Sequence, residues 1–291
     1  MIKKINLAIL AVFVAMSMAH GQDVRYSTAW FGPNANPVPE FTSAIIPVTT
    51  QLRVMGDVYF GGGDNTQNAY IDLEMPLLPE RVSIRIWTAL LEYYDVSESV
   101  AIERGMVAPY KGNAMGDFYV QTRISLLKET VYRPAIVLNL TMKSASGTQF
   151  KYRRYFDTPG YYFSLDMGKS FQVHNMHLQK IRLGAQLGFM SWETSGSRQN
   201  DAPMYGVKLS AINPRWQIDN TLSGYWGWMH THPYYGADYG DAPLVYALKI
   251  ARNTYKFNYF IQYQYGIKDY PYQQVRVGLE IPIARLTPDF K

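Results

Sequence analysis

Residues 253–283 constrain the fold more than any other part of the chain. Apolar and polar side chains alternate there over two consecutive segments, 255–265 and 274–281, which are separated by a short loop containing Gly266 and Pro271. Successive side chains of a strand point to opposite faces, so this period of two predicts two strands. One face carries tyrosines and aliphatic residues and the other carries amides and charges. That division is typical of a β-barrel with lipid outside and water inside.

The same alternation recurs along the chain from Gln51 onward. It predicts about twelve strands, within a range of about ten to fourteen, because strand boundaries are defined only to roughly two to four residues. Connections after even-numbered strands are mostly short, whereas several after odd-numbered strands are long, notably 93–116, 144–159 and 227–241. We therefore predict an all-β fold, a transmembrane antiparallel up-and-down β-barrel with short periplasmic turns and longer external loops. A soluble periplasmic sandwich or ligand-binding barrel is the alternative.

The chain divides into four regions. Lys3 and Lys4, the apolar run 7–18 and the small residues that follow predict a secretory signal peptide over residues 1–21. Residues 22–50 contain prolines and glycine that forbid regular structure, and this segment either lies in the periplasm or folds back into the lumen as a plug. The barrel spans residues 51–283, and residues 284–291 form a C-terminal tail.

Composition excludes several kinds of chemistry. The chain has no cysteine, so disulfides, thiolate metal sites and thiol nucleophiles are absent. Although 47% of the residues are hydrophobic, the part after the leader has no apolar stretch long enough for a membrane helix. The net charge of +5 comes from scattered basic residues, so no nucleic-acid footprint is visible. The glycine run 61–63 is not followed by the residues of a phosphate-binding loop.

The polar faces of the predicted strands give the candidate site, a charged lumen wall. Basic groups outnumber acidic ones there, which predicts weak anion selectivity for a water-filled lumen. The alternative is that these charges pair across strands and hold a filled interior together. Among such pairs we expect Asp72 and Glu74 to lie near Arg276, because the first and last strands must meet. The lumen-lining residues we predict are Arg85, Arg123, Lys143, Arg182, Lys208, Lys249, Lys256, Arg276, Asp72, Glu74, Asp219 and Glu280, with Asp166 on the same face.

Histidines are the remaining candidates for metal binding or acid–base catalysis. His230 and His232 lie in a long loop with Asp238 and Asp241, and alternating histidines beside a carboxylate are able to hold Zn²⁺. A loop rich in Tyr, Gly and Pro is more often an ordinary surface loop, so we predict no metal and no cofactor. No Ser, His and acid fall together at a strand end, and we expect no catalytic site and no enzyme activity.

Two stretches resemble known outer-membrane proteins. The hairpin 116–147, with Gly116-Asp117 opening a strand and Pro134 after the turn, resembles the barrels of phenol-degradation-pathway (MetA-type) transporters. A wider set of segments, 31–35, 198–202 and 264–271, is similar to uncharacterised outer-membrane β-barrel proteins of Bacteroidota-type bacteria. The resemblance implies the barrel fold and a location in the outer membrane of a Gram-negative bacterium, and it supplies no activity.

Three functions fit these features. The first is a pore or solute channel with a mildly basic polar lumen, passing small polar or anionic solutes. The second is a non-conducting barrel that acts as a scaffold, an assembly partner or a surface ligand-binding protein. The third is an outer-membrane lipid-modifying enzyme that uses a loop histidine. The expected partners are outer-membrane lipid and, during biogenesis, the outer-membrane assembly machinery, and we expect no nucleic acid.

Overall fold

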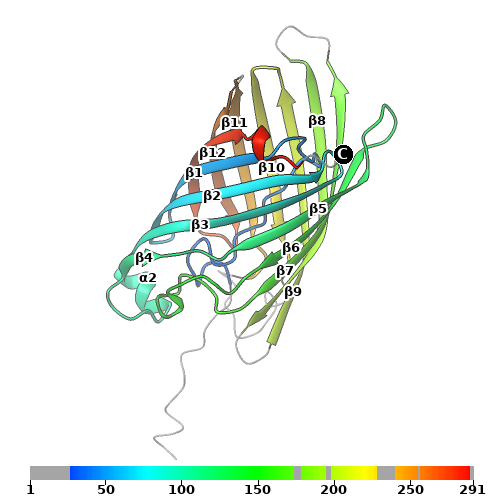
Figure 1. Ribbon diagram of the computed structural model, residues 1–291. Coiled ribbons are helices and arrows are strands. Elements are labelled where there is room, and N and C mark those ends of the chain that lie inside the picture. The colour runs from blue at the N-terminus through cyan, green and yellow to red at the C-terminus, as the bar shows by residue number, and fades with distance from the viewer. Residues whose placement is uncertain (1–26, 174–177, 195–197, 228–239, 255, 289–291) are drawn as a thin grey trace, which may run out of the picture.

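A closed antiparallel barrel of 12 strands makes up most of the protein (Figure 1). This computed structural model describes residues 27–173, 178–194, 198–227, 240–254 and 256–288. The barrel strands are β1 (Gln51–Phe60), β2 (Asp64–Leu78), β3 (Val82–Val96), β5 (Tyr119–Leu127), β6 (Ala135–Lys143), β7 (Gly160–Gln172), β8 (Lys180–Thr194), β9 (Arg198–Ile212), β10 (Trp216–Tyr225), β11 (Leu244–Asn253), β12 (Asn258–Lys268) and β13 (Gln273–Pro282).

The barrel closes between its first and last strands. β1 pairs antiparallel with β13 along its whole length, from Gln51 opposite Pro282 to Phe60 opposite Gln273. It pairs with β2 on its other side, and every later barrel strand pairs with its neighbours in the chain. The predicted up-and-down barrel and its strand number are therefore confirmed.

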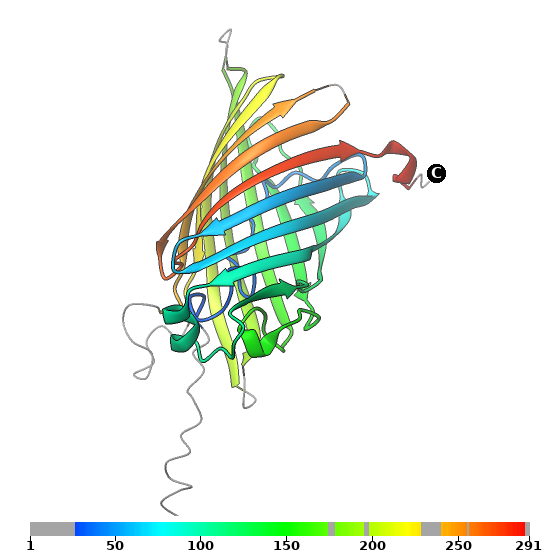
Figure 2. The same ribbon diagram turned by 90° about the vertical axis from the view of Figure 1, so that its left-hand side faces the viewer.

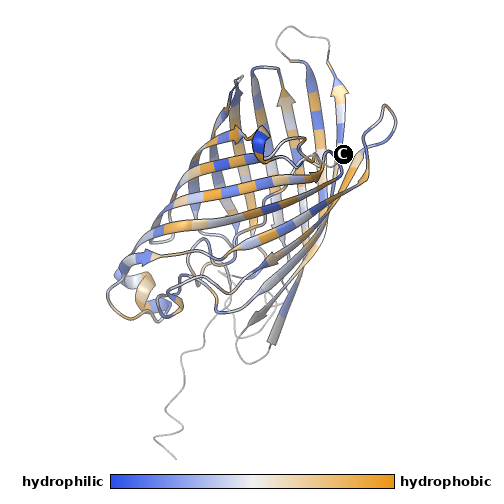
Figure 3. Ribbon diagram, in the orientation of Figure 1, coloured by the Kyte–Doolittle hydropathy of each residue, from blue (hydrophilic) through white to orange (hydrophobic). Residues whose placement is uncertain are grey.

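Side chains alternate between the outer and inner faces of the wall, as β1 illustrates. Val54 and Val58 are exposed on the outside, whereas Met55, Asp57 and Tyr59 between and beside them are buried in the interior. Figure 3 shows the resulting alternation of hydrophobic and hydrophilic bands along the strands. An apolar outer face around a polar interior is the arrangement that a membrane barrel requires.

Long connections gather at one end of the barrel. The connection from β3 to β5 contains the helix α2 (Glu98–Glu103) and the short strand β4 (Lys111–Ala114), which pairs with the end of β3 (Figure 2). The connection from β6 to β7 contains the 3-10 turn η1 (Phe150–Tyr152). We predicted a long loop over 93–116. The structure extends β3 to Val96 and places α2 and β4 within this connection.

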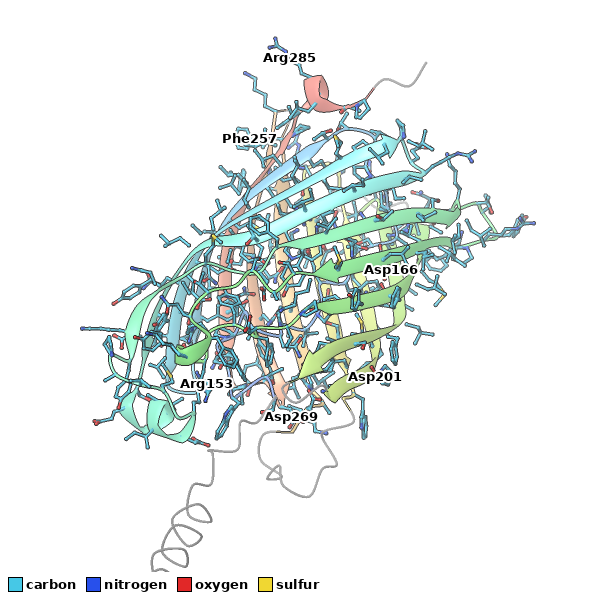
Figure 4. All side chains as sticks on the ribbon, turned by 60° about the horizontal axis from the view of Figure 1, so that its bottom comes forward. Arg153, Asp166, Asp201, Phe257, Asp269 and Arg285 are labelled. Atoms are coloured by element: carbon cyan, nitrogen blue, oxygen red, sulfur yellow. The ribbon has the colours of Figure 1, made fainter. Side chains whose placement is uncertain are left out.

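Short turns gather at the other end, together with the start of β1 and the end of β13. The ends of β2, β5, β7, β9 and β11 lie there, and η3 (Ala284–Leu286) follows β13 at the same end. Figure 4 shows Phe257 and Arg285 at this end and Arg153 and Asp269 at the opposite one. We call the two ends the short-turn end and the long-loop end.

The tight β1–β2 hairpin is an exception at the long-loop end. Gly61, Gly62 and Gly63 all have positive φ angles, of 92°, 60° and 72°. Glycine adopts these angles without steric cost, so three residues suffice to reverse the chain. Among the described residues, no helix is both long enough and apolar enough to cross a membrane.

The barrel lumen as the candidate functional site

Residues 27–50, which we call the N-terminal segment, run through the barrel from the long-loop end to the start of β1 (Figure 1, blue trace). At the long-loop end Phe31 is fully buried and packs on Phe156 with a ring-centroid distance of 4.2 Å. The Gly32 N–H donates to the carbonyl of Arg153 (2.8 Å), and the Asn34 amide donates to Glu92 Oε2 (2.6 Å). Of the two placements open from the sequence, the structure has the segment inside the lumen.

Loop 144–159 folds inward beside this entrance. The guanidinium of Arg154 is completely buried and contacts Asp64 and Glu92, each at 2.7 Å. Burial alone would lower the pKa of Arg154, but these two carboxylates raise it above its ordinary value. The Tyr155 hydroxyl donates to Glu92 at 2.7 Å. The loop therefore narrows the mouth of the barrel through buried, fully charged contacts.

Aromatic side chains surround the next part of the segment. Val38 packs against two buried clusters, one containing Tyr119 and Tyr162 and the other Tyr59 and Tyr270. Trp87 stacks on Tyr119 with ring centroids 4.9 Å apart. Since Pro37 and Pro39 flank Val38, the chain here is stiff and extended and fits between the rings.

Charged groups hold the segment one residue further on. Glu40 forms ion pairs with Arg85 and with Arg53, the latter at 3.4 Å, and Asp72 lies within 2.8 Å of the same two arginines. The two carboxylates and two guanidiniums thus form a balanced set of four. Asp72 and Arg85 are nearly inaccessible, so loss of the Glu40 charge leaves an unbalanced positive charge inside the lumen.

Phe41 occupies a hollow in the opposite wall. A Cβ atom on Gly184 would lie 3.0 Å from the Phe41 ring, and one on Gly206 would lie 3.4 Å from it. The ring therefore fills space that these two glycines leave open. Lys208 donates to the Phe41 carbonyl at 2.9 Å, which fixes the backbone of the segment at this position.

Side chains of the wall bind the last part of the segment before β1. Arg123 donates to the Thr42 hydroxyl (3.0 Å) and to the Ile45 carbonyl (2.9 Å), and Arg182 donates to the Ser43 carbonyl (3.0 Å). The Thr42 hydroxyl in turn donates to Asp166. The bonds to Ser43 and Ile45 supply donors for main-chain carbonyls of an irregular segment that has no neighbouring strand to pair with.

A cavity of about 140 Å³ remains beside the N-terminal segment. Residues 37–41 form one side of it, together with the aromatic rings described above. The last strands contribute the neutral polar side chains Thr221, Ser223, Gln262, Gln264 and Gln274 to its lining, together with the charged Asp219, Lys249 and Arg276. The lumen is thus largely filled, and its free space lies between the N-terminal segment and the surrounding wall, which includes β10–β13.

Eleven of the twelve lumen-lining residues predicted from the sequence lie on strands and face the interior. Most of the basic ones are ion-paired: Arg85 with Asp72, Arg123 with Glu74 (2.5 Å), Lys143 with Asp117 (2.6 Å), Arg182 with Glu129 and Arg276 with Asp57 (2.6 Å). Asp166 is also buried in the interior. Lys208 and Lys249 form no ion pair with any described residue. Of the acidic residues, Glu280 accepts a hydrogen bond from Asn258 (3.2 Å) and Asp219 accepts one from Gln217 (2.8 Å).

Two of the predicted positions need correction. Lys256 lies exposed in the turn between β11 and β12 and does not line the lumen, because β12 begins only at Asn258. Arg276 does not pair with Asp72 or Glu74. It pairs with Asp57, which lies directly opposite it across the β1–β13 closure, whereas Asp72 and Glu74 lie one strand further away on β2.

Several residues of the lumen were not among the predicted ones. Arg53 and Asp57 lie at the inward positions of β1, and the same alternation that identified the other strands could have found them. Glu40 and Phe41 belong to a segment without periodicity, so no sequence signal placed them in the lumen. His230, His232 and Asp238 of the loop considered for metal binding lie outside the described residues. The described residues contain no group of three or more His, Cys, Asp or Glu side chains placed to hold a metal ion.

Comparison with known proteins shows the fold. No protein-family model and no curated protein matches the sequence. Among solved structures, the COG4313 outer membrane channel from Pseudomonas putida F1 is similar with a TM-score of 0.61 and 10% identity, over 85% of this chain and 100% of that one. The NanC porin is similar with a TM-score of 0.51 and 10% identity, over 80% of this chain and 100% of that one. The chain therefore has the fold of outer-membrane β-barrel channels and porins.

Proposed function

We propose that this protein is an outer-membrane channel for small polar solutes whose lumen is closed by its own N-terminal segment. The observation that carries the proposal is the position of residues 37–43. They cross the middle of the barrel, and neutral hydrogen-bonding side chains of β10–β13 are prominent in the lining of the cavity that remains beside them. A solute would pass along this amide and hydroxyl wall once the segment moves aside.

The proposal includes a weak preference for anions. Lys208 and Lys249 are the lumen bases without an ion pair among the described residues, and both line the cavity. Positive charges beside a narrow aqueous path attract anions and repel cations. The other lumen bases have carboxylate partners, whereas Asp219, which lies opposite Lys249 between β10 and β11, lines the same cavity without an ion pair to any described residue. The preference therefore rests on the excess of these two lysines over this one carboxylate. Replacing both lysines with glutamine would remove it, which a reversal potential in a salt gradient measures.

The proposed location is the outer membrane of a Bacteroidota-type Gram-negative bacterium. The exposed apolar outer face supports an outer-membrane location. The Bacteroidota-type source rests only on the resemblance that segments such as 264–271 have in sequence. The likeness of hairpin 116–147 to phenol-degradation-pathway transporters is compatible with a transport role.

Single-channel recording in planar bilayers tests the function. The chain has no native cysteine, so the variant Thr42→Cys with Asp166→Cys carries only the two thiols that would fasten the N-terminal segment to β7. A short bis-thiol cross-linker should abolish conductance steps, and cleavage of the linker should restore them. Each single-cysteine variant, treated identically, is the control. Conductance that is the same before and after cross-linking would mean that the segment does not gate the lumen.

A non-conducting barrel is the second candidate. The balanced charge set around Glu40 and the buried contacts of Arg154 favour it, because they fill the lumen as a core does. It predicts no conductance steps from the folded parent protein. The lipid-modifying enzyme considered from the sequence relied on loop histidines outside the described residues, and no observation adds to it.

A further inference from the structure

Three acidic or amide side chains meet at the long-loop end, away from the charged groups of the lumen. Asn200 lies near the start of β9, Asp241 just before β11, and Asp269 in the short loop between β12 and β13. Figure 4 shows Asp269 at this end of the barrel. Segments far apart in the sequence therefore bring these residues together at the rim.

Hydrogen bonds define the arrangement. The Asn200 amide nitrogen donates to Asp241 Oδ2. The Ala242 N–H donates to Asp269 Oδ2 (3.0 Å), and the Gly227 N–H donates to the Asp241 carbonyl (2.6 Å). A Cβ on Gly227 would overlap the Asp241 carboxylate, so glycine is needed for this close approach. Hydrogen bonds thus fix the Asp241 side chain through Asn200 and the Asp269 side chain through the backbone of Ala242.

Two oxygen atoms at this place have no hydrogen-bond partner. They are Asn200 Oδ1 and Asp241 Oδ1, and the two residues are 0% and 1% exposed. Asp241 also forms no ion pair with any described residue. A buried carboxylate without a compensating charge is strongly unfavourable, and it must take up either a proton or a cation. Burial, together with the negative charge of Asp269, raises the pKa of Asp241 to about 8, although the Asn200 hydrogen bond opposes this shift.

We propose that Asn200, Asp241 and Asp269 form a calcium-binding site at the long-loop end of the barrel. All three residues supply oxygen ligands, which suit a hard cation such as Ca²⁺ and not Zn²⁺, whose sites favour nitrogen and sulfur. Ca²⁺ also accepts the irregular geometry of ligands drawn from two loops and a strand end, with water completing its shell, whereas Mg²⁺ demands a near-ideal octahedron. Asn200 adds a third oxygen ligand to the two carboxylates, and its Oδ1 atom has no other hydrogen-bond partner.

The site also touches the beginning of the N-terminal segment. The Thr28 hydroxyl donates to the main-chain carbonyl of Asp269. A bound ion would therefore tie together β9, residues 240–243, the β12–β13 loop and the start of the segment that fills the lumen. Binding itself does not depend on the proposed channel function, and its test uses no conductance measurement.

Terbium luminescence tests the site directly. Tb³⁺ is a probe for calcium sites that aromatic side chains sensitise, and Tyr225 lies close to both Asp241 and Asp269. Folded, EDTA-treated protein in detergent should give sensitised emission that Ca²⁺ displaces, with a dissociation constant of roughly 10⁻⁴ to 10⁻³ M, as in extracellular calcium modules. The variant Asp241→Asn should lower the calcium affinity at least about tenfold. Asp157→Asn, an exposed carboxylate at the same end, is the control and should leave the affinity unchanged.

Thermal unfolding of the same samples gives a second readout. Calcium should raise the temperature of the heat-induced gel shift of the parent protein and leave that of Asp241→Asn unchanged. If Asp241→Asn does not fold, Asp269→Asn replaces it with the same expectation. Equal calcium affinity in parent and folded variant, or no effect of calcium on the parent, would overturn the site.

Discussion

Asp57 on β1 and Arg276 on β13 lie directly opposite each other, and the guanidinium donates to both carboxylate oxygens at 2.6 Å. The Asp57 side chain is completely inaccessible and also accepts from Gln274 at 3.1 Å. This bidentate pair joins the first strand to the last, so it acts at the one place where the barrel must close. Charge-assisted bonds of this geometry are the strong ones, and they favour the correct register of closure.

The first prediction concerns that closure. Arg276→Gln should destabilise the barrel by roughly 3–5 kcal/mol, because it leaves the buried Asp57 carboxylate without its charge partner. Denaturant titration of the folded protein in detergent, read as loss of heat-modifiable mobility, measures the change. Lys128→Gln is the control, since the Lys128–Glu80 pair is more than half exposed at both side chains and should contribute little. A similar small effect from both variants would contradict a special role for the closing pair.

The second prediction concerns the charge set around Glu40. Glu40→Gln should raise the fraction of time that the channel conducts, because Arg53 and Arg85 then share the single carboxylate of Asp72 and hold the N-terminal segment less firmly. Single-channel recording measures the open fraction. Glu80→Gln, at an exposed turn, is the matched control. An open fraction equal to that of the parent would show that the ion pairs do not hold the lumen closed.

The third prediction concerns the hollow that receives Phe41. Gly184→Leu should displace the Phe41 ring, since even a single Cβ there would lie 3.0 Å from it. The expected result is a larger conductance with an intact barrel, because Gly184 lies on the wall and its change leaves strand pairing in place. The clash with the Phe41 ring should also lower the stability of Gly184→Leu. Adding Phe41→Ala removes the ring that the new leucine side chain overlaps, so the double variant should regain barrel stability while its lumen stays open. Unchanged conductance in Gly184→Leu would mean that the segment repacks around the new side chain.

The barrel itself could be predicted from the sequence because each strand records its own two faces. In β1, the outward Val54 and Val58 alternate with the inward Met55 and Asp57. Every strand of a membrane barrel shows this pattern, because one of its faces meets lipid and the other meets the lumen. No knowledge of the partner strand is needed for that inference. This is why strand number and strand direction followed from periodicity, while β4 and α2, which depend on contacts within one loop, did not.

The candidate site was less predictable because it depends on pairings between distant segments. The alternating pattern placed Asp72 and Arg276 on inward faces. It does not say which residues of two neighbouring strands lie opposite each other, so it did not identify Asp57 as the partner of Arg276. The contacts of Glu40 and Phe41 belong to a segment whose prolines remove the repeating pattern. Lys256 was misplaced because the alternating pattern of the sequence begins in the turn, before β12 itself begins at Asn258.

The fourth prediction concerns the pH dependence of stability at the proposed calcium site. Asp241 has a pKa of about 8 in the folded protein against an ordinary value of 3.8, so between these two values the folded state holds a proton that the unfolded state has released. Its contribution to stability is therefore largest below about pH 4, falls as the pH rises toward 8, and is constant above that value.

Asp241→Asn should remove this slope, because asparagine keeps the shape and has no proton to lose. In chelator, the variant should be more stable than the parent at pH 9 and should differ least from it at pH 4. The heat-induced gel shift, recorded for both proteins from pH 4 to 9, gives the difference between the two curves and cancels the titration of all shared groups. Asp157→Asn should run parallel to the parent throughout. A parallel curve for Asp241→Asn as well would mean that Asp241 is ionised in the folded protein across this range.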